Sequence, residues 1–316
     1  MTSRSRKQST EQPNKASAKL DTLTALQIAR LINGEDAKVA KAVKKALPQI
    51  AKAIDLAADA LSHGGRLIYV GAGTSGRIAA LDASECPPTF NTESWQVQYV
   101  IAGGETALGS AIEGKEDSRE LGEQDIAGRK PGAGDLVVGI AASGRTPYTV
   151  AAVEYARARG AKTVALVCNP GSPLAKAAQL AIVVEVGPEV LTGSSRMKAG
   201  TAQKMVLNMI STGAMARLGY VYGNLMVNVH FNNQKLVERG FRIVQQITGL
   251  NQARTAQLLH DARNVPTALV MNHARVNRDE AIRRLKRARG NVRKAIEGKD
   301  SQSKKKTRKR GGRAGL

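Results

Sequence analysis

Three short segments of the chain combine glycine with serine or threonine close to a predicted helix start. They are residues 71–76 (GAGTSG), 143–147 (SGRTP) and 191–196 (LTGSSR). Glycine lets the backbone approach a ligand closely, and the N–H groups at a helix N-terminus attract negative charge. Hydroxyl side chains add further hydrogen-bond donors. The three segments therefore predict a site for an anion such as a phosphate group.

The residues expected to contact this anion share small size or a donor group. They are Gly73, Thr74, Ser75, Gly76, Ser143, Gly144, Arg145, Thr146, Ser194, Ser195 and Lys198. Lys198 follows the third segment closely enough to reach an anion held by Ser194 and Ser195. Lys204 lies further along the same predicted helix and is expected to be solvated.

The first segment also fits the dinucleotide-binding pattern G-x-G-x-x-G, which is weak evidence by itself. A nicotinamide site favours an acidic residue at the end of the second strand, about 20 residues further on. Here that strand ends in residues 102–104 (AGG), and Glu105 comes rather late. The hydroxyl groups of the segments favour a sugar phosphate instead. Each segment taken alone also fits a purely structural turn.

Two carboxylates are candidates for acid–base chemistry, Glu85 in SECPP and Glu116 in KEDS. Removing a proton beside a carbonyl needs a base within reach, and two carboxylates in different environments can divide the roles of acid and base. Each of them also fits a surface or capping glutamate.

Cys86 has no histidine near it in sequence, which favours a small buried residue over a nucleophile. The four histidines lack metal-ligand spacing, so no metal site is predicted.

The elements that must position these residues alternate along the chain. Short apolar runs predict strands over 67–70, 95–101, 136–141, 163–168 and 181–186, with helices between them and over 20–32 and 36–62. This alternation predicts an α/β fold with a doubly wound, mostly parallel five-stranded sheet flanked by helices. Ligands of such sheets bind beyond the carboxyl ends of the strands. The first two glycine segments fall at such ends.

The chain is expected to have four parts. Residues 1–16 form a disordered polar tail, 17–240 the α/β domain with its N-terminal helices, 241–298 a small helical domain, and 299–316 a basic disordered tail. The short helices of the small domain have candidate caps at Asn251, Pro266 and Asn277.

Positive charge is concentrated at the C-terminal end, where residues 273–316 carry 13 of the 22 net positive charges. Such a tail is compatible with contact to nucleic acid or anionic lipid, but a solvated extension is the favoured interpretation.

No apolar run is long enough for a membrane span, and no signal peptide is evident. Cys86 and Cys168 make no disulfide framework. We therefore expect a cytoplasmic protein.

Six blocks along residues 20–295 carry a resemblance to a known family: GRLIYVGAGTSGR, LDASECPPTF, EGKEDSRE, GDLVVGIAASGRTPY, VGPEVLTGSSRMKAGTAQK and YGNLMVNV. The chain resembles the N-acetylmuramic acid 6-phosphate etherases, which contain a sugar isomerase (SIS) domain. The resemblance implies a lyase that cleaves the D-lactyl ether of its substrate to give N-acetylglucosamine 6-phosphate and D-lactate, without a cofactor. It also implies Glu85 as the proton donor and Glu116 as the second catalytic residue, acting as the base.

The same resemblance implies a homodimer, a ubiquitin-associated-like C-terminal helical domain and a place in the recycling or catabolism of cell-wall amino sugars. Two alternatives stay open. One is a non-catalytic sugar-phosphate regulator similar to glucokinase regulatory protein, which resembles two such domains in tandem. The other is a nucleic-acid-binding regulator, although residues 1–35 are too short for the helix-turn-helix that such proteins carry ahead of this domain.

Overall fold

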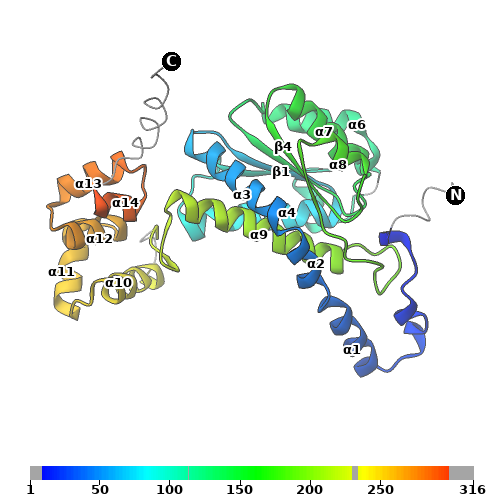
Figure 1. Ribbon diagram of the computed structural model, residues 1–316, viewed down its shortest axis with the longest axis horizontal. Coiled ribbons are helices and arrows are strands. Elements are labelled where there is room, and N and C mark those ends of the chain that lie inside the picture. The colour runs from blue at the N-terminus through cyan, green and yellow to red at the C-terminus, as the bar shows by residue number, and fades with distance from the viewer. Residues whose placement is uncertain (1–8, 113, 230–233, 299–316) are drawn as a thin grey trace, which may run out of the picture. The chain divides into compact units, whose positions relative to one another are not determined.

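The computed structural model describes residues 9–112, 114–229 and 234–298 (Figure 1). The chain divides into two compact units. The first contains the described residues up to 86 and from 93 to 214, and the second contains residues 87–92 and the described residues from 215 onward.

The first unit is built on one sheet of five parallel strands. The strands are β1 (Leu67–Gly71), β2 (Val97–Ile101), β3 (Leu136–Ile140), β4 (Lys162–Val167) and β5 (Leu180–Val183), in the spatial order β2-β1-β3-β4-β5. All residues of β1 and β3 are buried, as expected for short apolar strands covered on both faces. The predicted fold class is confirmed, and the sheet is parallel throughout.

The helices that lie in or begin in this unit are α1 (Ala25–Asp36), α2 (Val39–Lys45), α3 (Leu47–Ser62), α4 (Gly73–Phe90), α5 (Thr106–Gly109), α6 (Arg119–Gly128), α7 (Pro147–Ala158), α8 (Pro173–Ala177) and α9 (Lys198–Leu218). Side chains of β1 alternate between the faces of the sheet. Ile68 and Val70 join the apolar cluster formed with α6, α7 and α8. Tyr69 faces the other way, and its hydroxyl donates to Asp82 in α4. Figure 1 shows the strands between α6–α8 on one side and α3, α4 and α9 on the other, a doubly wound arrangement.

The helix predicted over 36–62 is two helices, α2 and α3, separated at Ala46. Pro48 lies in the first turn of α3. Its nitrogen carries no hydrogen, and its ring would clash with the carbonyl four residues earlier, which disfavours one continuous helix through this point. The structure also starts α1 at a capping box made by Thr24 and Gln27, a few residues after the predicted start at residue 20.

The expectation of disorder over residues 1–16 is wrong for the part that the structure describes. Ser9–Glu11 and Lys15–Ser17 form short 3-10 turns, and Thr10 is buried. The amide of Asn169, beyond the end of β4, donates to Thr10 Oγ1 over 3.0 Å and accepts from the Ser9 backbone N–H over 3.1 Å. These bonds hold a polar segment that has no apolar periodicity of its own. Residues 1–8 lie outside the described residues.

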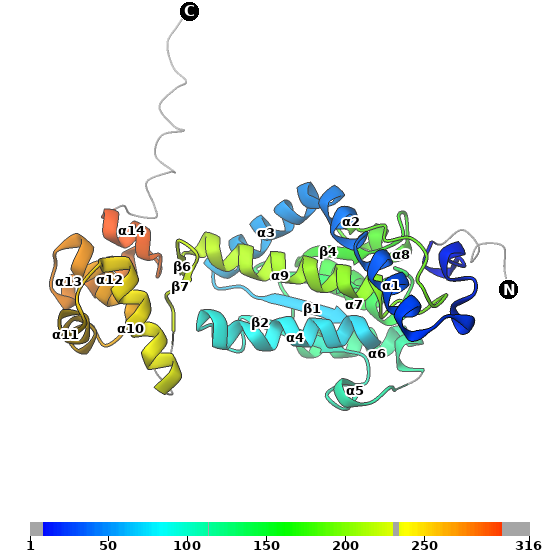
Figure 2. The same cartoon turned by 90° about the horizontal axis from the view of Figure 1, so that it is seen from below.

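The second unit contains α10 (Gln234–Thr248), α11 (Gln252–Ala262), α12 (Val265–Ala274), α13 (Arg278–Arg287) and α14 (Val292–Glu297), with a small hairpin of β6 (Val221–Tyr222) and β7 (Leu225–Met226). Figure 2 shows α12 packed among the other helices, and its Leu269 and Val270 are fully buried in their shared apolar cluster. The unit therefore has its own core.

Asparagine side chains begin the helices α11 to α14, because each accepts a hydrogen bond from the first helical turn. The caps predicted at Asn251 and Asn277 are confirmed. Asn264 caps α12 in place of Pro266, which lies in the first turn where its missing N–H costs nothing. The domain limits 17–240 and 241–298 stay predictions, as does the ubiquitin-associated-like fold, and the predicted tail over 299–316 lies outside the described residues.

Candidate functional site

The order of the strands places two of the glycine segments on either side of one point. From β1 the chain passes through α4 to β2 on one side, and β3, β4 and β5 follow on the other side. Direction therefore reverses between β1 and β3, and open α/β sheets bind ligands at such a switch point. The register pairs Gly71 with Ile140, so the loops after β1 and β3 begin at the same level of the sheet. The structure thus brings the first and second segments together.

The first segment turns directly into α4, which begins at Gly73. Gly73 has a φ of +52°, a conformation that side chains with a Cβ rarely adopt. Thr74, Ser75 and Gly76 therefore occupy the first turn of a long helix, where the helix dipole favours negative charge. Ser75 is buried, and its hydroxyl donates to Gln203 Oε1 in α9 over 3.0 Å.

The second segment leads from β3 into α7, where Pro147 is the first helical residue. Gly144 has a φ of +68°, and a Cβ there would lie 2.1 Å from the Ser172 hydroxyl, so only glycine fits. The Ser143 hydroxyl accepts from the Arg145 backbone N–H over 3.2 Å. Thr146 occupies the N-cap position of α7 without a capping bond from its side chain, and the Arg145 side chain is exposed. The Thr146 hydroxyl is therefore not used to cap α7.

The third segment lies beside the first. A Cβ on Gly200 in α9 would lie 3.5 Å from Thr74 Cγ2 and 3.7 Å from the Ser195 carbonyl oxygen. Ser194 and Ser195 are half-buried. The N-terminus of α9 already holds an anionic group, because the buried carboxylate of Glu189 accepts from the backbone N–H groups of Lys198 and Ala199 over 3.0 and 2.9 Å. These two donors are therefore not open to a ligand.

Lys198 is buried, and its ammonium group is bonded within the protein. Its Nζ donates to Glu35 Oε2 in α1 over 2.6 Å, and Lys38 pairs with the other oxygen of that carboxylate. Burial acts to raise the pKa of Glu35, but the bonds from Lys198 and Lys38 outweigh it and lower the pKa to about 2. The structure shows Lys198 holding α1 to α9, and its contact with a bound anion stays a prediction.

The two candidate catalytic carboxylates lie on different elements. Glu85 is exposed on α4, just before Pro87 and Pro88, which continue the same helix. Glu116 is exposed in the 3-10 turn Lys115–Asp117. Among the described residues, no hydrogen bond or ion pair joins the two. Their acid and base roles therefore stay predictions.

A buried polar cluster that the sequence patterns missed lies one turn before Glu85. The Asp82 carboxylate accepts from the Tyr69 hydroxyl, Asn208 Nδ2 and the Ser211 hydroxyl over 2.8, 2.6 and 3.1 Å. Desolvation and the nearby Asp82 charge raise the pKa of Tyr69, so its hydroxyl stays a proton donor. The cluster fixes α4 against β1 and α9. An aspartate inside an otherwise apolar helical stretch was the one signal that could have revealed it.

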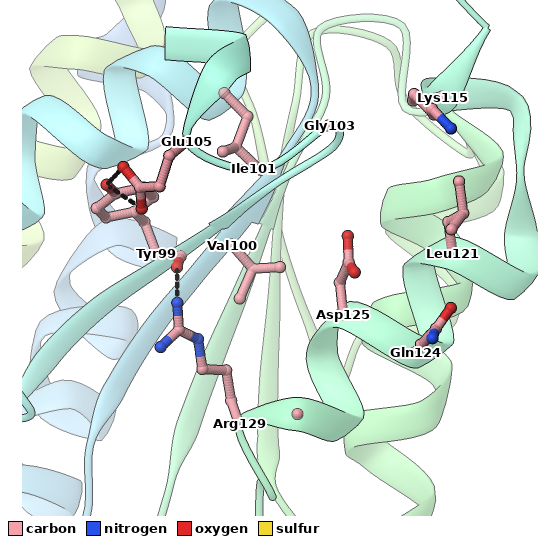
Figure 3. Close-up of a pocket in the computed structure, with 12 residues that line it drawn as sticks. Tyr99, Val100, Ile101, Gly103, Glu105, Lys115, Leu121, Gln124, Asp125 and Arg129 are labelled. Carbon is pink, nitrogen blue, oxygen red and sulfur yellow. Dashed lines mark hydrogen bonds between the residues drawn. The ribbon is translucent and has the colours of Figure 1, made fainter.

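A cavity of about 620 Å³ opens between β2 and α6 (Figure 3). Tyr99 and Glu105 line one side, Gln124 and Asp125 line the other, and Lys115 comes from the turn that carries Glu116. Glu105 accepts from the Tyr99 hydroxyl over 2.9 Å. Cavities of this size hold small molecules. Glu116 therefore follows directly after Lys115, which lines a cavity large enough for a small ligand.

The structure contains no group of three or more histidine, cysteine, aspartate or glutamate side chains placed to hold a metal, as far as its described residues extend. Within that same part of the chain, none of the helices has the length and apolar character needed to span a bilayer.

Comparison with known proteins assigns the chain. Residues 49–157 match the family described as glucokinase regulatory protein N-terminal SIS domain, and residues 132–212 match the SIS domain family. The chain is 54% identical over 282 residues to N-acetylmuramic acid 6-phosphate etherase of Aeromonas hydrophila, covering 89% of this chain and 95% of that protein. The chain belongs to the N-acetylmuramic acid 6-phosphate etherase family.

Two further relatives carry the same name. The chain is 51% identical to the etherase of Vibrio vulnificus over 92% of this chain and 97% of that one, and 48% identical to the etherase of Clostridium beijerinckii over 93% and 97%. Among solved structures, a phosphoheptose isomerase from Neisseria gonorrhoeae aligns with a TM-score of 0.48 at 18% identity, covering 61% of this chain and all of that one. The etherase family thus spans both units of this chain, whereas the SIS domain spans residues of the first alone.

Proposed function

We propose that this chain is an etherase that cleaves N-acetylmuramic acid 6-phosphate into N-acetylglucosamine 6-phosphate and D-lactate. The observation that carries the proposal is the 48–54% identity to etherases over about nine-tenths of the chain. The two hydroxyl-glycine loops at the switch point of the sheet support it, because they offer donors to the phosphate of a sugar phosphate. A regulator without catalysis would not need the two carboxylates.

The chemistry follows from the functional groups of the substrate. Opening of the sugar ring exposes an aldehyde at C1, which makes the hydrogen at C2 acidic. We infer that Glu116 removes that proton and that Glu85 protonates the lactyl oxygen as the C3–O bond breaks. Water then adds across the resulting C2–C3 double bond, placing a hydroxyl at C3 and a proton at C2. The sum is a hydrolysis with no net oxidation, so it needs no redox cofactor.

The primary test is to incubate the purified chain with N-acetylmuramic acid 6-phosphate and to measure both products. Lactate release from the phosphorylated substrate but not from N-acetylmuramic acid supports the proposal. In H₂¹⁸O, the label should enter the C3 hydroxyl of the sugar and not the lactate, because the C3–O bond is the one broken. Well-folded protein that releases no lactate would exclude the etherase assignment and favour a sugar-phosphate regulator.

Two variants separate the roles of the carboxylates. Glu116→Gln should lose both lactate release and exchange of the C2 hydrogen with D₂O, because no base remains. Glu85→Gln should lose lactate release by at least about 10²-fold but keep the exchange, since the proton at C2 can still leave. Glu93→Gln, at an exposed glutamate on the segment before β2, is the matched control and should behave as wild type. Exchange that survives in Glu116→Gln would remove that residue from the role of base.

We infer that the enzyme is a homodimer. A groove of about 650 Å³ between α3 and α9 is lined largely by apolar side chains, among them Leu47, Ile54, Met205 and Met209. Leu47 is 43% exposed, which is unfavourable in water for a side chain of this size. A second copy is the occupant that the family resemblance favours. Light scattering should give twice the chain mass, and Leu47→Asp should shift the protein toward monomer, whereas a monomeric wild type would contradict the inference.

We also infer that the reaction takes place in the cytoplasm and serves the recycling or catabolism of cell-wall amino sugars. Cys86 and Cys168 are both free and buried, which suits a reducing compartment. Cell fractionation with an antibody to this chain would test the location.

A further inference from the structure

One buried side chain beside the first phosphate loop has an unfilled hydrogen-bonding group. Gln203 in α9 is 1% exposed, and its Oε1 accepts from the Ser75 hydroxyl over 3.0 Å. Its Nε2 has no hydrogen-bond partner among the described residues. A buried amide nitrogen without a partner costs free energy, so its presence in a native structure calls for an explanation.

The surroundings place this amide at the loop and not in a remote part of the core. Gly200 lies one turn before Gln203, so the two share a face of α9. A Cβ on Gly200 would lie 3.5 Å from Thr74 Cγ2, which shows that this face packs on the first turn of α4. Gln203 therefore lies directly behind the residues that are expected to hold the phosphate.

The present orientation of the amide works against that role of Ser75. A phosphate oxygen accepts hydrogen bonds, and it needs the proton of the Ser75 hydroxyl. That proton is directed at Gln203 Oε1. Turning the amide by 180° about its last torsion exchanges Oε1 and Nε2, which are nearly identical in shape. Nε2 then donates to Ser75 Oγ, and the Ser75 proton is released to point toward the ligand.

We propose that Gln203 is a positioning residue for substrate binding, and that its amide sets Ser75 as a donor to the phosphate. The proposal rests on the proposed function, because it assumes a sugar phosphate at this loop. In the bound state the chain of bonds runs from Gln203 Nε2 to Ser75 Oγ and from the Ser75 hydroxyl to a phosphate oxygen. The turned amide leaves a carbonyl oxygen without a partner in place of an N–H group. A buried carbonyl oxygen without a partner costs less than a buried N–H group without one.

The first variant to test is Gln203→Glu. A carboxylate accepts only, so it keeps the Ser75 proton and adds a negative charge close to the phosphate. We expect KM for N-acetylmuramic acid 6-phosphate to rise at least 20-fold, with kcat changed by less than fivefold. The ratio of the variant's KM to the wild-type KM, measured at the same pH, should fall as the pH is lowered, because a protonated carboxyl group regains a donor. Gln252→Glu, the same change at an exposed site on α11, is the matched control.

The second variant covers the case in which Gln203→Glu fails to fold. Gln203→Met keeps the length of the side chain without hydrogen bonds, and KM should rise about tenfold. Ser75→Ala should have a similar effect, and the double variant should be no worse than Ser75→Ala alone, because both changes break one chain of bonds. Independent, additive effects of the two single changes would overturn the proposal. So would a KM within twofold of wild type in folded Gln203→Met.

A binding measurement separates this proposal from the proposed function. Calorimetry with N-acetylglucosamine 6-phosphate needs no turnover, and the variants should lose affinity by the same factors. If wild type binds this sugar phosphate but releases no lactate, the etherase assignment fails while the role of Gln203 is still measured. If wild type does not bind it, the role of Gln203 in holding the phosphate fails, and lactate release decides the etherase assignment separately.

Discussion

Replacing Lys198 by methionine should destabilise the protein because it leaves the Glu35 carboxylate buried without its main partner. The two side chains are 2% and 5% exposed, and their charged atoms are 2.6 Å apart. Removing one partner of a buried ion pair costs about 3–5 kcal/mol. Lys38 retains its contact with Glu35, but its side chain is 62% exposed, so it compensates only in part. We expect a loss of about 3 kcal/mol in the free energy of unfolding.

The lowered pKa of Glu35, to which both Lys198 and Lys38 contribute, gives the pH range over which the pair stabilises the protein. Its fall from 4.5 to about 2 corresponds to roughly 3 kcal/mol at 1.36 kcal/mol per unit. Because the folded-state pKa lies below the unfolded one, this stabilisation is complete above pH ~4.5 and is lost as the pH falls toward 2. Wild type should therefore lose more stability than Lys198→Met between pH 5 and pH 3.

Urea unfolding followed by circular dichroism at pH 7 and at pH 3.5 measures both quantities. Lys38→Met is the matched control and should cost less than about 1 kcal/mol, since its ammonium group is mostly in water. The double variant Glu35→Gln with Lys198→Met should recover part of the lost stability, because the unpaired charge is gone. A loss below 1 kcal/mol in Lys198→Met, or an acid response equal to that of wild type, would refute the reasoning.

Further predictions concern the second loop and the thiols. Gly144→Ala should cost more than about 2 kcal/mol, because its Cβ would lie 2.1 Å from the Ser172 hydroxyl at a φ of +68°. Gly104→Ala, at a φ of +66° with nothing within 4 Å, should cost only about 1 kcal/mol, and equal thermal shifts would contradict the steric argument. Burial raises the pKa of Cys86 and of Cys168 to about 12, so neither should react with a thiol reagent at pH 8 until the protein is denatured. A rapid reaction of the native protein with a chromogenic thiol reagent, seen as an increase in absorbance, would refute this.

The parts of the fold that the sequence predicts are those with a local signal. The strands of the sheet are short and rich in β-branched and other apolar residues, and the loops after β1 and β3 carry glycine where the backbone needs it, at Gly73 and Gly144. Asn251 and Asn277 satisfy donors only three residues away. Strand order was not encoded locally, but the rules for parallel sheets placed both loops at the carboxyl edge.

The polar contacts that shape the site could not be predicted, because they join residues far apart in the chain. Ser75 and Gln203 are 128 positions apart, and Glu35 and Lys198 are 163 apart. Periodicity reports which face of a helix is apolar, and it says nothing about which polar group meets another. Lys198 illustrates the consequence. A lysine beside a serine loop suggests an anion ligand, and periodicity gave no sign that its ammonium group also bonds a buried carboxylate.

Glu85 and Glu116 show why geometry and resemblance contribute different parts of the proposed mechanism. Both carboxylates are exposed, whereas a general acid and base in a sugar site work best when water is excluded from them. The Asp82 cluster fixes the helix that carries Glu85, so what must change on binding is the solvent around the carboxylate and not its backbone. Glu85 lies twelve residues along α4 from Gly73, about 18 Å at 1.5 Å per residue, so a sugar phosphate held at the first loop does not reach the Glu85 of its own chain. If the phosphate binds at this loop, the Glu85 that serves it has to come from a second chain, which is why the dimer and the etherase activity should be measured on the same preparation.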